Sequence, residues 1–130
     1  MLLDRLQQFF PSTPDLMRHL SPGACWQYSI HENALDDPPE LEYFLRKNDE
    51  SSIEMITNPP VDKPDLILYF TERAILQLVD GNPAAEEFYA RYKQLMDRPG
   101  PGMELDSKVN RSKMQLFKMG YKQWQDTFRF

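Results

Sequence analysis

The side chains that could do chemistry in this chain are few, and their spacing does not suit it. Cys25 and His31 are separated by five residues, whereas zinc ligands in proteins usually come in closer pairs. His19 is the only other histidine. We therefore expect no metal and no cofactor. We interpret these residues as a buried thiol at Cys25 and exposed imidazoles at His19 and His31.

Other polar residues also lack the neighbours that catalysis would need. Ser29 and Ser107 would act as nucleophiles only beside a histidine base, and the sequence places none there. The turn at 100–102 (GPG) is too constrained by proline to cradle a phosphate. Paired carboxylates fall in predicted turns or on exposed helix faces, where they do no acid–base work. These pairs are Asp36–Asp37, Asp49–Glu50 and Glu86–Glu87. The sequence therefore predicts no catalytic residue and a protein that is not an enzyme.

Composition and charge indicate a soluble protein that does not bind nucleic acid. The net charge of −5 opposes phosphate binding, which needs a surplus of lysine and arginine. A single cysteine excludes an internal disulfide and suits a reducing cytoplasm. The stretch MLLDRLQQFF lacks the features of a signal peptide, and no apolar run approaches the roughly twenty residues that span a bilayer. We therefore expect a cytoplasmic protein without stable membrane insertion.

Charge is distributed unevenly along the chain. Residues 32–65 contain ten acidic side chains against three basic ones, while residues 104–130 contain six basic against three acidic ones. Two solvated faces of different elements would explain this asymmetry. The competing interpretation is a docking surface for an acidic partner or an anionic lipid.

Hydrophobic periodicity predicts helices and strands in a mixed order. Alternating apolar residues predict strands, and repeats of three to four residues, ended by proline or glycine, predict helices. The expected strands are 25–31, 41–46, 52–57, 65–70 and 103–109, and the expected helices are 2–10, 72–80, 83–97 and about 112–127, with a further helical start at 12–20. This order predicts an α+β fold, with a five-stranded, mostly antiparallel sheet and helices on one face. We expect a single domain over 1–130, with an N-terminal helical segment at 1–22 and a core at 24–128.

The strand at 66–70 is apolar at every position, so we expect cover on both of its faces. The helices at 72–80 and 83–97 should cover one face, and the last helix and the N-terminal helix should complete the cover. Thr71 is the expected N-cap of the first of these helices. Gly120 falls inside the expected last helix, where it would permit close packing on the sheet or leave room for a ligand, and we favour packing.

Three consecutive stretches carry a resemblance to a known family. PDLILYF (64–70) reads as an aspartate followed by an apolar strand, AILQLVDG (74–81) as a short helix that ends in glycine, and NPAAEEF (82–88) as the start of a second helix. With the order of the other elements, this pattern resembles the sterol carrier protein family, the nonspecific lipid-transfer domain. The resemblance covers roughly residues 24–128.

The resemblance implies a carrier that holds a fatty acyl, sterol or isoprenoid lipid in an apolar tunnel between sheet and helices, without chemistry. Methionine suits such a tunnel because its flexible side chain adapts to different ligands. Core packing is the competing interpretation of the same side chains. The expected ligand-binding residues are Leu68, Phe70, Ile75, Val79, Phe88, Tyr92, Met96, Phe117, Tyr121 and Trp124.

The alternative function is a protein-interaction module whose tunnel is filled by its own side chains. Such a module would dock or self-associate through exposed apolar helix faces. The candidate surfaces are Leu2, Leu3, Leu6, Phe9 and Phe10 at one end, and Phe128, Arg129 and Phe130 at the other.

Overall fold

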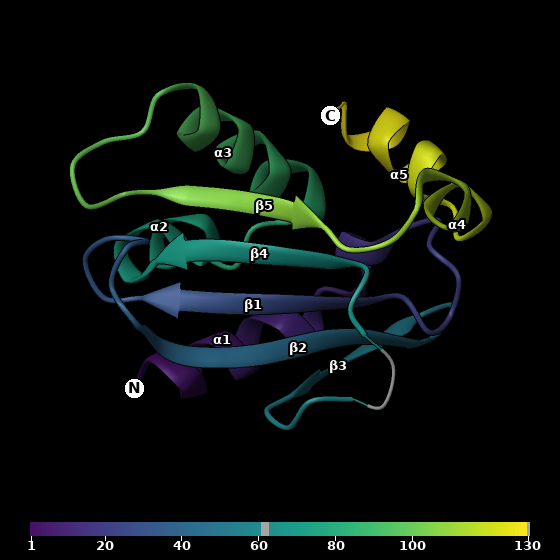
Figure 1. Ribbon diagram of the computed structural model, residues 1–130, viewed down its shortest axis with the longest axis horizontal. Coiled ribbons are helices and arrows are strands. Elements are labelled where there is room, and N and C mark those ends of the chain that lie inside the picture. Colours follow the sequence, from purple (N-terminus) through teal and green to yellow (C-terminus); the bar gives the residue numbers. More distant parts are fainter. Residues whose placement is uncertain (61–62, 130) are drawn as a thin grey trace.

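The computed structural model describes residues 1–60 and 63–129, which build one sheet with helices packed on it (Figure 1). The strands are β1 (Cys25–His31), β2 (Pro39–Asp49), β3 (Ser52–Ile56), β4 (Leu66–Thr71) and β5 (Leu105–Val109). The helices are α1 (Leu2–Phe9), α2 (Glu72–Val79), α3 (Ala85–Asp97), α4 (Lys113–Lys118) and α5 (Tyr121–Phe128), with short 3₁₀ turns at Phe10–Ser12 and Pro14–Met17.

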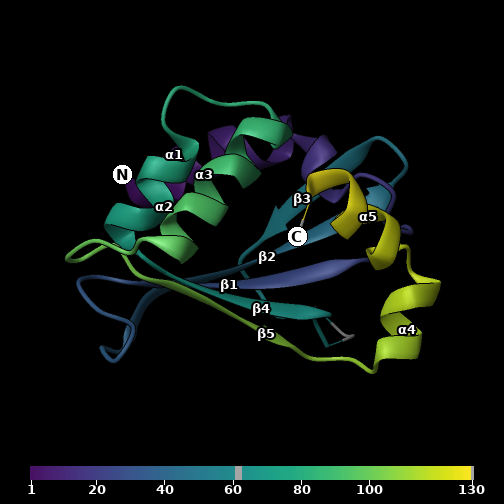
Figure 2. The ribbon, with the colours of Figure 1, turned by 90° about the horizontal axis from the view of Figure 1, so that it is seen from above.

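The sheet has five strands in the order β3-β2-β1-β4-β5. All neighbouring strands pair antiparallel except β1 and β4, which are parallel. Helices α1, α2, α3 and α5 lie over the same face of the sheet, as the view from above shows (Figure 2). The predicted α+β fold, with a mostly antiparallel sheet and helices on one face, is therefore confirmed.

Strand β4 carries helices on only one face, so the expected cover on both faces is wrong. Leu68 and Phe70 point into the core and are buried, whereas Ile67 and Tyr69 point to the other face and are half-buried. Tyr69 is shielded sideways by the neighbouring strand, since its ring lies 6.4 Å from that of His31. Large side chains in adjacent strands thus protect one another where no helix lies above them.

The N-terminal segment packs into the protein's own core. Leu6, Phe9 and Phe10 are almost completely buried, and the Phe10 ring lies 5.1 Å from that of Tyr28 on β1. For Leu6, Phe9 and Phe10 the expectation of an exposed docking surface is therefore wrong, whereas Leu2 and Leu3 are half-buried. The apolar spacing predicted a short helix that needs a packing partner, and the core of the same chain supplies this partner.

Two polar groups fasten this segment to distant parts of the chain. The Leu16 carbonyl accepts hydrogen bonds from Tyr89 Oη (2.6 Å) and from Trp124 Nε1 (2.9 Å). Lys47, which lies just beyond the predicted strand at 41–46, belongs to β2 and is buried. Its Nζ donates to the Met17 carbonyl (3.0 Å) and the Leu20 carbonyl (2.7 Å), which satisfies a buried ammonium group.

The predicted C-terminal helix is broken in two at Gly120. This residue has φ = +95° and separates α4 from α5. A Cβ atom there would lie 2.1 Å from the His19 carbonyl oxygen, so the backbone of the 18–21 segment passes against the bend. The Ser21 amide also donates to the Met119 carbonyl (2.9 Å). The single helix over 112–127 is thus wrong, and Gly120 serves close backbone packing.

Thr71 lies where the sequence predicts the N-cap of α2, but its side chain has another role. Thr71 is the N-cap residue of α2, but its side chain makes no capping bond. Instead Thr71 Oγ1 donates to the Gly102 carbonyl (2.8 Å) and accepts from the Glu104 amide (3.0 Å). These bonds hold the loop before β5 against the end of β4.

Candidate functional site

A groove opens on the helix-covered face of the sheet, between α3 on one side and the α4–α5 pair on the other. Its cavity volume is about 610 Å³. The floor comes from two rows of paired residues across β1, β4 and β5, and both rows face the helices because side chains alternate along a strand. The two rows are Trp26–Leu66–Val109 and Tyr28–Leu68–Ser107. The floor is therefore apolar apart from Ser107 and the polar atoms of the aromatic rings.

The walls of the groove are mainly aromatic and aliphatic. Phe88, Tyr92 and Met96 are spaced by four residues on α3, so they form one stripe that faces the groove. The opposite wall comes from Leu116 and Phe117 on α4, with Tyr121 and Trp124 on α5. The remaining residues that line the cavity are Tyr89, Lys113, Lys122 and Gln125.

Most of the residues expected to contact a ligand gather in this groove. Those that line it are Leu68, Phe88, Tyr92, Met96, Phe117, Tyr121 and Trp124. Phe70, Ile75 and Val79 do not line it and are buried in the core instead. Phe70 lies one row beyond Leu68 on β4, where its ring packs edge-on against Tyr92 at 6.1 Å. Trp26 and Tyr28 were not anticipated, because the sequence did not indicate that β1 pairs with β4.

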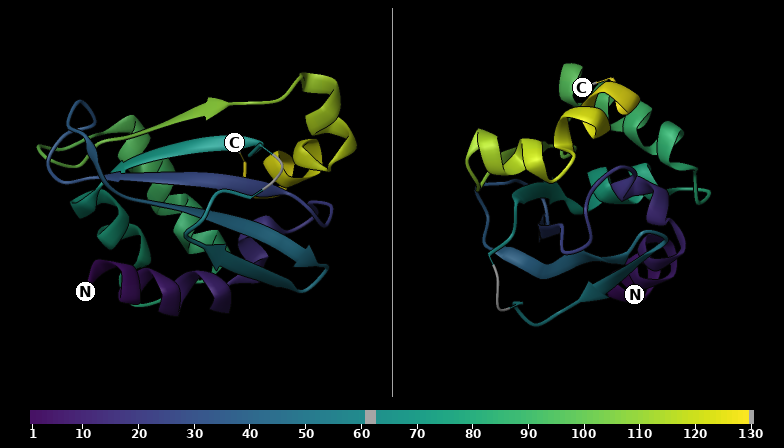
Figure 3. Two further views of the ribbon diagram at one scale, coloured as in Figure 1. Left: turned by 60° about the horizontal axis from the view of Figure 1, so that its bottom comes forward. Right: turned by 90° about the vertical axis from the view of Figure 1, so that its right-hand side faces the viewer.

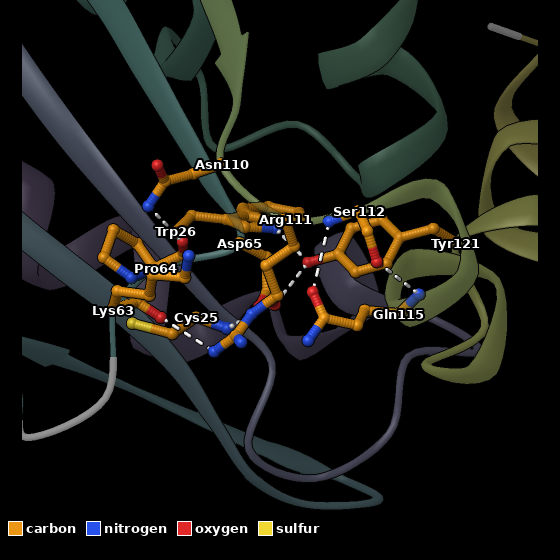
Figure 4. Close-up of polar contacts among 10 residues, drawn as sticks. All are labelled: Cys25, Trp26, Lys63, Pro64, Asp65, Asn110, Arg111, Ser112, Gln115 and Tyr121. Atoms are coloured by element: carbon orange, nitrogen blue, oxygen red, sulfur yellow. Dashed lines mark hydrogen bonds and ion pairs between the residues drawn. The ribbon is translucent and has the colours of Figure 1, made fainter.

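A buried polar network closes the end of the groove at α5 (Figure 4). The Asp65 carboxylate is fully buried and accepts hydrogen bonds from Tyr121 Oη (2.7 Å) and from the Cys25 amide (3.1 Å). It also forms an ion pair with Arg111. Trp26 Nε1 in turn donates to Tyr121 Oη (2.9 Å). Since a buried carboxylate needs partners on each lone pair, this network holds β1, β4 and α5 at fixed distances.

Arg111 extends the same network to the start of α4. Its Nη2 donates to the Lys63 carbonyl (2.9 Å), and the neighbouring Asn110 Nδ2 donates to the Pro64 carbonyl (2.8 Å). Ser112 and Gln115 then form a capping box at the first turn of α4. The position of α4 is thus set by polar contacts at its beginning.

Tyr121 belongs both to the groove and to the network. Burial raises the pKa of its phenol far above the usual value, and the charge and hydrogen bond of Asp65 raise this pKa further. A neutral phenol can donate to Asp65 while it accepts from Trp26. Tyr121 is therefore an uncharged part of the groove wall rather than a general base.

Strand β1 also brings Ser29 and His31 together, contrary to the expectation that no histidine lies beside a candidate serine. Ser29 Oγ is 3.1 Å from His31 Nε2, and His31 Nδ1 is 2.6 Å from the Asp37 carbonyl oxygen. A carbonyl only accepts, so in the neutral ring Nδ1 carries the hydrogen and Nε2 accepts from the serine. Both side chains are buried, which also corrects the expected exposure of His31. The predicted burial of Cys25 is confirmed.

The Ser29–His31 pair has the contacts of an activated nucleophile but not the surroundings of an active site. Neither residue lines the groove, and Ser29 as a whole is only 3% exposed, too little for a substrate to reach it. Within residues 1–60 and 63–129, moreover, no three histidine, cysteine or acidic side chains are grouped so that they could hold a metal ion. The pair joins the loop at Asp37 to the sheet.

Comparison with known proteins gives similarity at the level of structure only. No protein-family model matches the chain, and no curated protein matches it either. Among solved structures, the chain is similar to a protein described as the UbiJ-SCP2 ubiquinone synthesis protein, with 9% identity over 97% of this chain and 89% of that one and a TM-score of 0.44.

Two further similar structures are sterol carrier proteins from eukaryotes. Sterol carrier protein 2 from Yarrowia lipolytica, in its apo form, is 16% identical over 79% of this chain and 73% of that one, with a TM-score of 0.46. The sterol carrier protein domain 2 of Helicoverpa armigera is 9% identical over 99% and 86% of the two chains, with a TM-score of 0.44. All three descriptions name the family that residues 64–88 resemble. Because each TM-score is below 0.5, the function has to be inferred from the groove itself.

Proposed function

We propose that the protein binds an apolar small molecule in the groove between α3, the α4–α5 pair and the sheet, and carries it without chemical change. The observation that supports this function is the cavity of about 610 Å³ with a largely aromatic and aliphatic lining. Sites for small molecules in proteins usually have volumes of roughly 300–1,000 Å³ and an apolar lining. The ligand class that fits is a fatty acyl, sterol or isoprenoid lipid.

The driving force for such binding is the removal of hydrocarbon from water. Each methylene group that enters the groove contributes about 0.8 kcal/mol. The walls suit ligands of different shape, because Met96 and Leu116 present flexible aliphatic chains beside rigid rings. Selectivity should follow the length and shape of the ligand, since the lining of the groove is predominantly aromatic and aliphatic.

The proposed carrier works without catalysis, in keeping with the lining of the groove. Among the described residues that line the groove there is no carboxylate, histidine or cysteine side chain, so Ser107 has none of these bases beside it in the groove. The Asp65 carboxylate, which bonds to the lining residue Tyr121, is also paired with Arg111. A cytoplasmic location remains part of this proposal, since a single cysteine rules out an internal disulfide and suits a reducing compartment. None of the helices in the described ranges is long and apolar enough to cross a bilayer.

The structure favours the carrier over the interaction module. A module with a filled tunnel would leave no cavity of this volume. Its expected docking surfaces are also largely occupied. At one end Leu6, Phe9 and Phe10 are buried, with Leu2 and Leu3 half-buried, and at the other end Phe128 is buried. Arg129 is exposed, and Phe130 lies outside the described residues.

Native mass spectrometry of freshly purified protein, followed by solvent extraction, tests the carrier function directly. A reproducible adduct that extracts as a lipid supports it. A bare chain mass that does not change on incubation with fatty acids and sterols contradicts it. The experiment needs no assumption about which lipid is the natural ligand.

Substitution of a floor residue should remove binding without loss of the fold. Ser107→Trp places an indole in the groove from an exposed position on β5, so we expect binding of a fluorescent fatty acid to fall at least tenfold. Asp106→Trp is the matched control, because the neighbouring side chain on the strand points to the opposite face. Equal binding by both variants, with unchanged circular dichroism, would place the ligand elsewhere.

A further inference from the structure

Exposed apolar side chains gather around the mouth of the groove. Phe117 and Met114 on α4 are 69% and 68% exposed, Val109 at the end of β5 is 58% exposed and Met96 on α3 is 52% exposed. Three of these four line the groove, and Met114 lies one helical turn before Phe117. Large apolar side chains that are exposed together on one surface indicate contact with something apolar.

Helix α4 holds this surface in place. None of its residues is buried, so hydrophobic packing alone does not explain its position. Its start is fixed by the Arg111–Asp65 ion pair and by the Ser112–Gln115 capping box. The helix lies at one end of the molecule, beyond the last residues of β5 (Figures 1 and 3). The exposed side chains of α4 are therefore presented by an ordered, accessible element.

The charge around this surface is positive, although the whole chain has a net charge of −5. Residues 107–122 contain five basic side chains and no acidic one. Successive residues of an α-helix turn by about 100°, so Lys113 and Lys118 flank Phe117 and Met114 around the helix. Within the described part of the chain, no salt bridge involves Lys113, Lys118 or Lys108. Exposed apolar residues bordered by lysines are typical of a helix that lies in a membrane interface.

We propose that α4 and the end of β5 form a docking surface for an anionic lipid bilayer. Phe117 and Met114 enter the boundary between head groups and acyl chains, and Lys108, Lys113 and Lys118 face the anionic head groups. Because Phe117 also lines the groove, the mouth of the groove then faces the membrane. This contact goes beyond the proposed lipid binding: it gives an apolar ligand a path between bilayer and groove that avoids water.

Vesicle flotation with the full chain tests the docking surface. The probes are vesicles of phosphatidylcholine alone and vesicles in which about one third of the lipid is phosphatidylglycerol. We expect binding to the anionic vesicles only, and a steep loss of binding as the salt concentration rises. Absence of binding to the anionic vesicles at low salt would overturn the proposal.

A double variant locates the contact. Met114→Ser with Lys118→Gln removes one apolar and one basic side chain, neither of which lines the groove. We expect binding to anionic vesicles to fall roughly tenfold. Leu76→Ser with Arg98→Gln is the matched control, since it makes the same two kinds of change on exposed residues elsewhere. Equal loss in both variants, or no loss in the first, would overturn the assignment to α4.

The same proteins separate this proposal from the proposed function. Uptake of a fluorescent fatty acid from solution, without vesicles, reports on the groove alone. Uptake without vesicle binding would refute only the docking surface, and vesicle binding without uptake would refute only the carrier. A stable dimer in solution that the α4 variant dissociates would show that a second copy of the chain covers this surface instead. Binding of an acidic protein to this surface, without any binding to vesicles, would likewise refute the proposed contact with a membrane.

Discussion

Gly120 shows how a single residue decides the course of the C-terminal region. Its left-handed φ of +95° turns the chain between α4 and α5. A Cβ atom at this position would lie only 2.1 Å from the His19 carbonyl oxygen. Any other residue would meet both backbone strain and a collision. The bend therefore depends on glycine twice, once for conformation and once for space.

Gly120→Ala should destabilise the protein by at least about 2 kcal/mol, because strain and the collision act together. The free energy of unfolding in urea measures this loss. Gly81→Ala is the control: Gly81 also has a positive φ (+73°), but nothing lies within 4 Å of its Cβ position. We expect a cost of about 1 kcal/mol there. Similar costs at the two sites would contradict the proposed contact with His19.

Residues whose role depends on distant partners could not be predicted from the sequence. Asp65 looked like the first residue of a strand, and its role as a buried acceptor for Arg111 and Tyr121 needs contacts across 46 and 56 positions. The role of Lys47, which lies just beyond the predicted strand at 41–46, could not be predicted for the same reason, since its acceptors lie 27 and 30 residues earlier. Local pattern carries no information about such pairs.

At the scale of elements, hydrophobic spacing predicted most helices and strands close to their observed positions. The strand at 25–31 and the helices at 72–80 and 83–97 correspond to β1, α2 and α3 within about two residues. Seven of the ten residues expected to contact a ligand line the groove, because an apolar stripe such as that of α3 has to face the sheet. It could not predict the parallel pairing of β1 with β4, which brings Trp26 and Tyr28 into the floor.

Helix α4 should be the least protected helix of the molecule. It has six residues and buries none of them, and short helices have little stability without packing. In hydrogen exchange we expect the amides of 113–118 to exchange much faster than those of α3, whose Phe88, Tyr89 and Tyr92 are buried. Equal protection of the two helices would mean that α4 is covered in solution. Addition of anionic vesicles should slow exchange in α4 selectively if it docks there.

At the scale of the whole molecule, the core is unusually aromatic and contains buried phenols. Burial raises the pKa of Tyr28, Tyr43 and Tyr89 well above the usual value of about 10. Because the pKa is higher in the folded state than in the unfolded state, the stability linked to these phenols is complete below about pH 10 and is lost as the pH rises beyond it. The buried phenols thus stay protonated at high pH only while the protein remains folded.

Alkaline titration should therefore be cooperative. We expect the tyrosinate absorbance of these residues to appear together with the loss of near-ultraviolet circular dichroism, because the phenols ionise only when the core opens. In denaturant the same groups should titrate near pH 10. Gradual ionisation with an intact circular dichroism spectrum would show that the phenols are accessible in the folded protein.

The two hydrogen bonds on the Leu16 carbonyl have a consequence for the synthesis of the chain. Their donors, Tyr89 and Trp124, lie 73 and 108 residues later. At about 5–20 residues per second, a ribosome reaches the second donor roughly 5–20 s after it has made the acceptor. During most of that interval Phe9 lacks Phe88, on which its ring stacks, and the Leu16 carbonyl lacks both of its donors. The nascent chain thus exposes the kind of apolar segment that chaperones bind, and folding to completion must wait until α5 has left the ribosome.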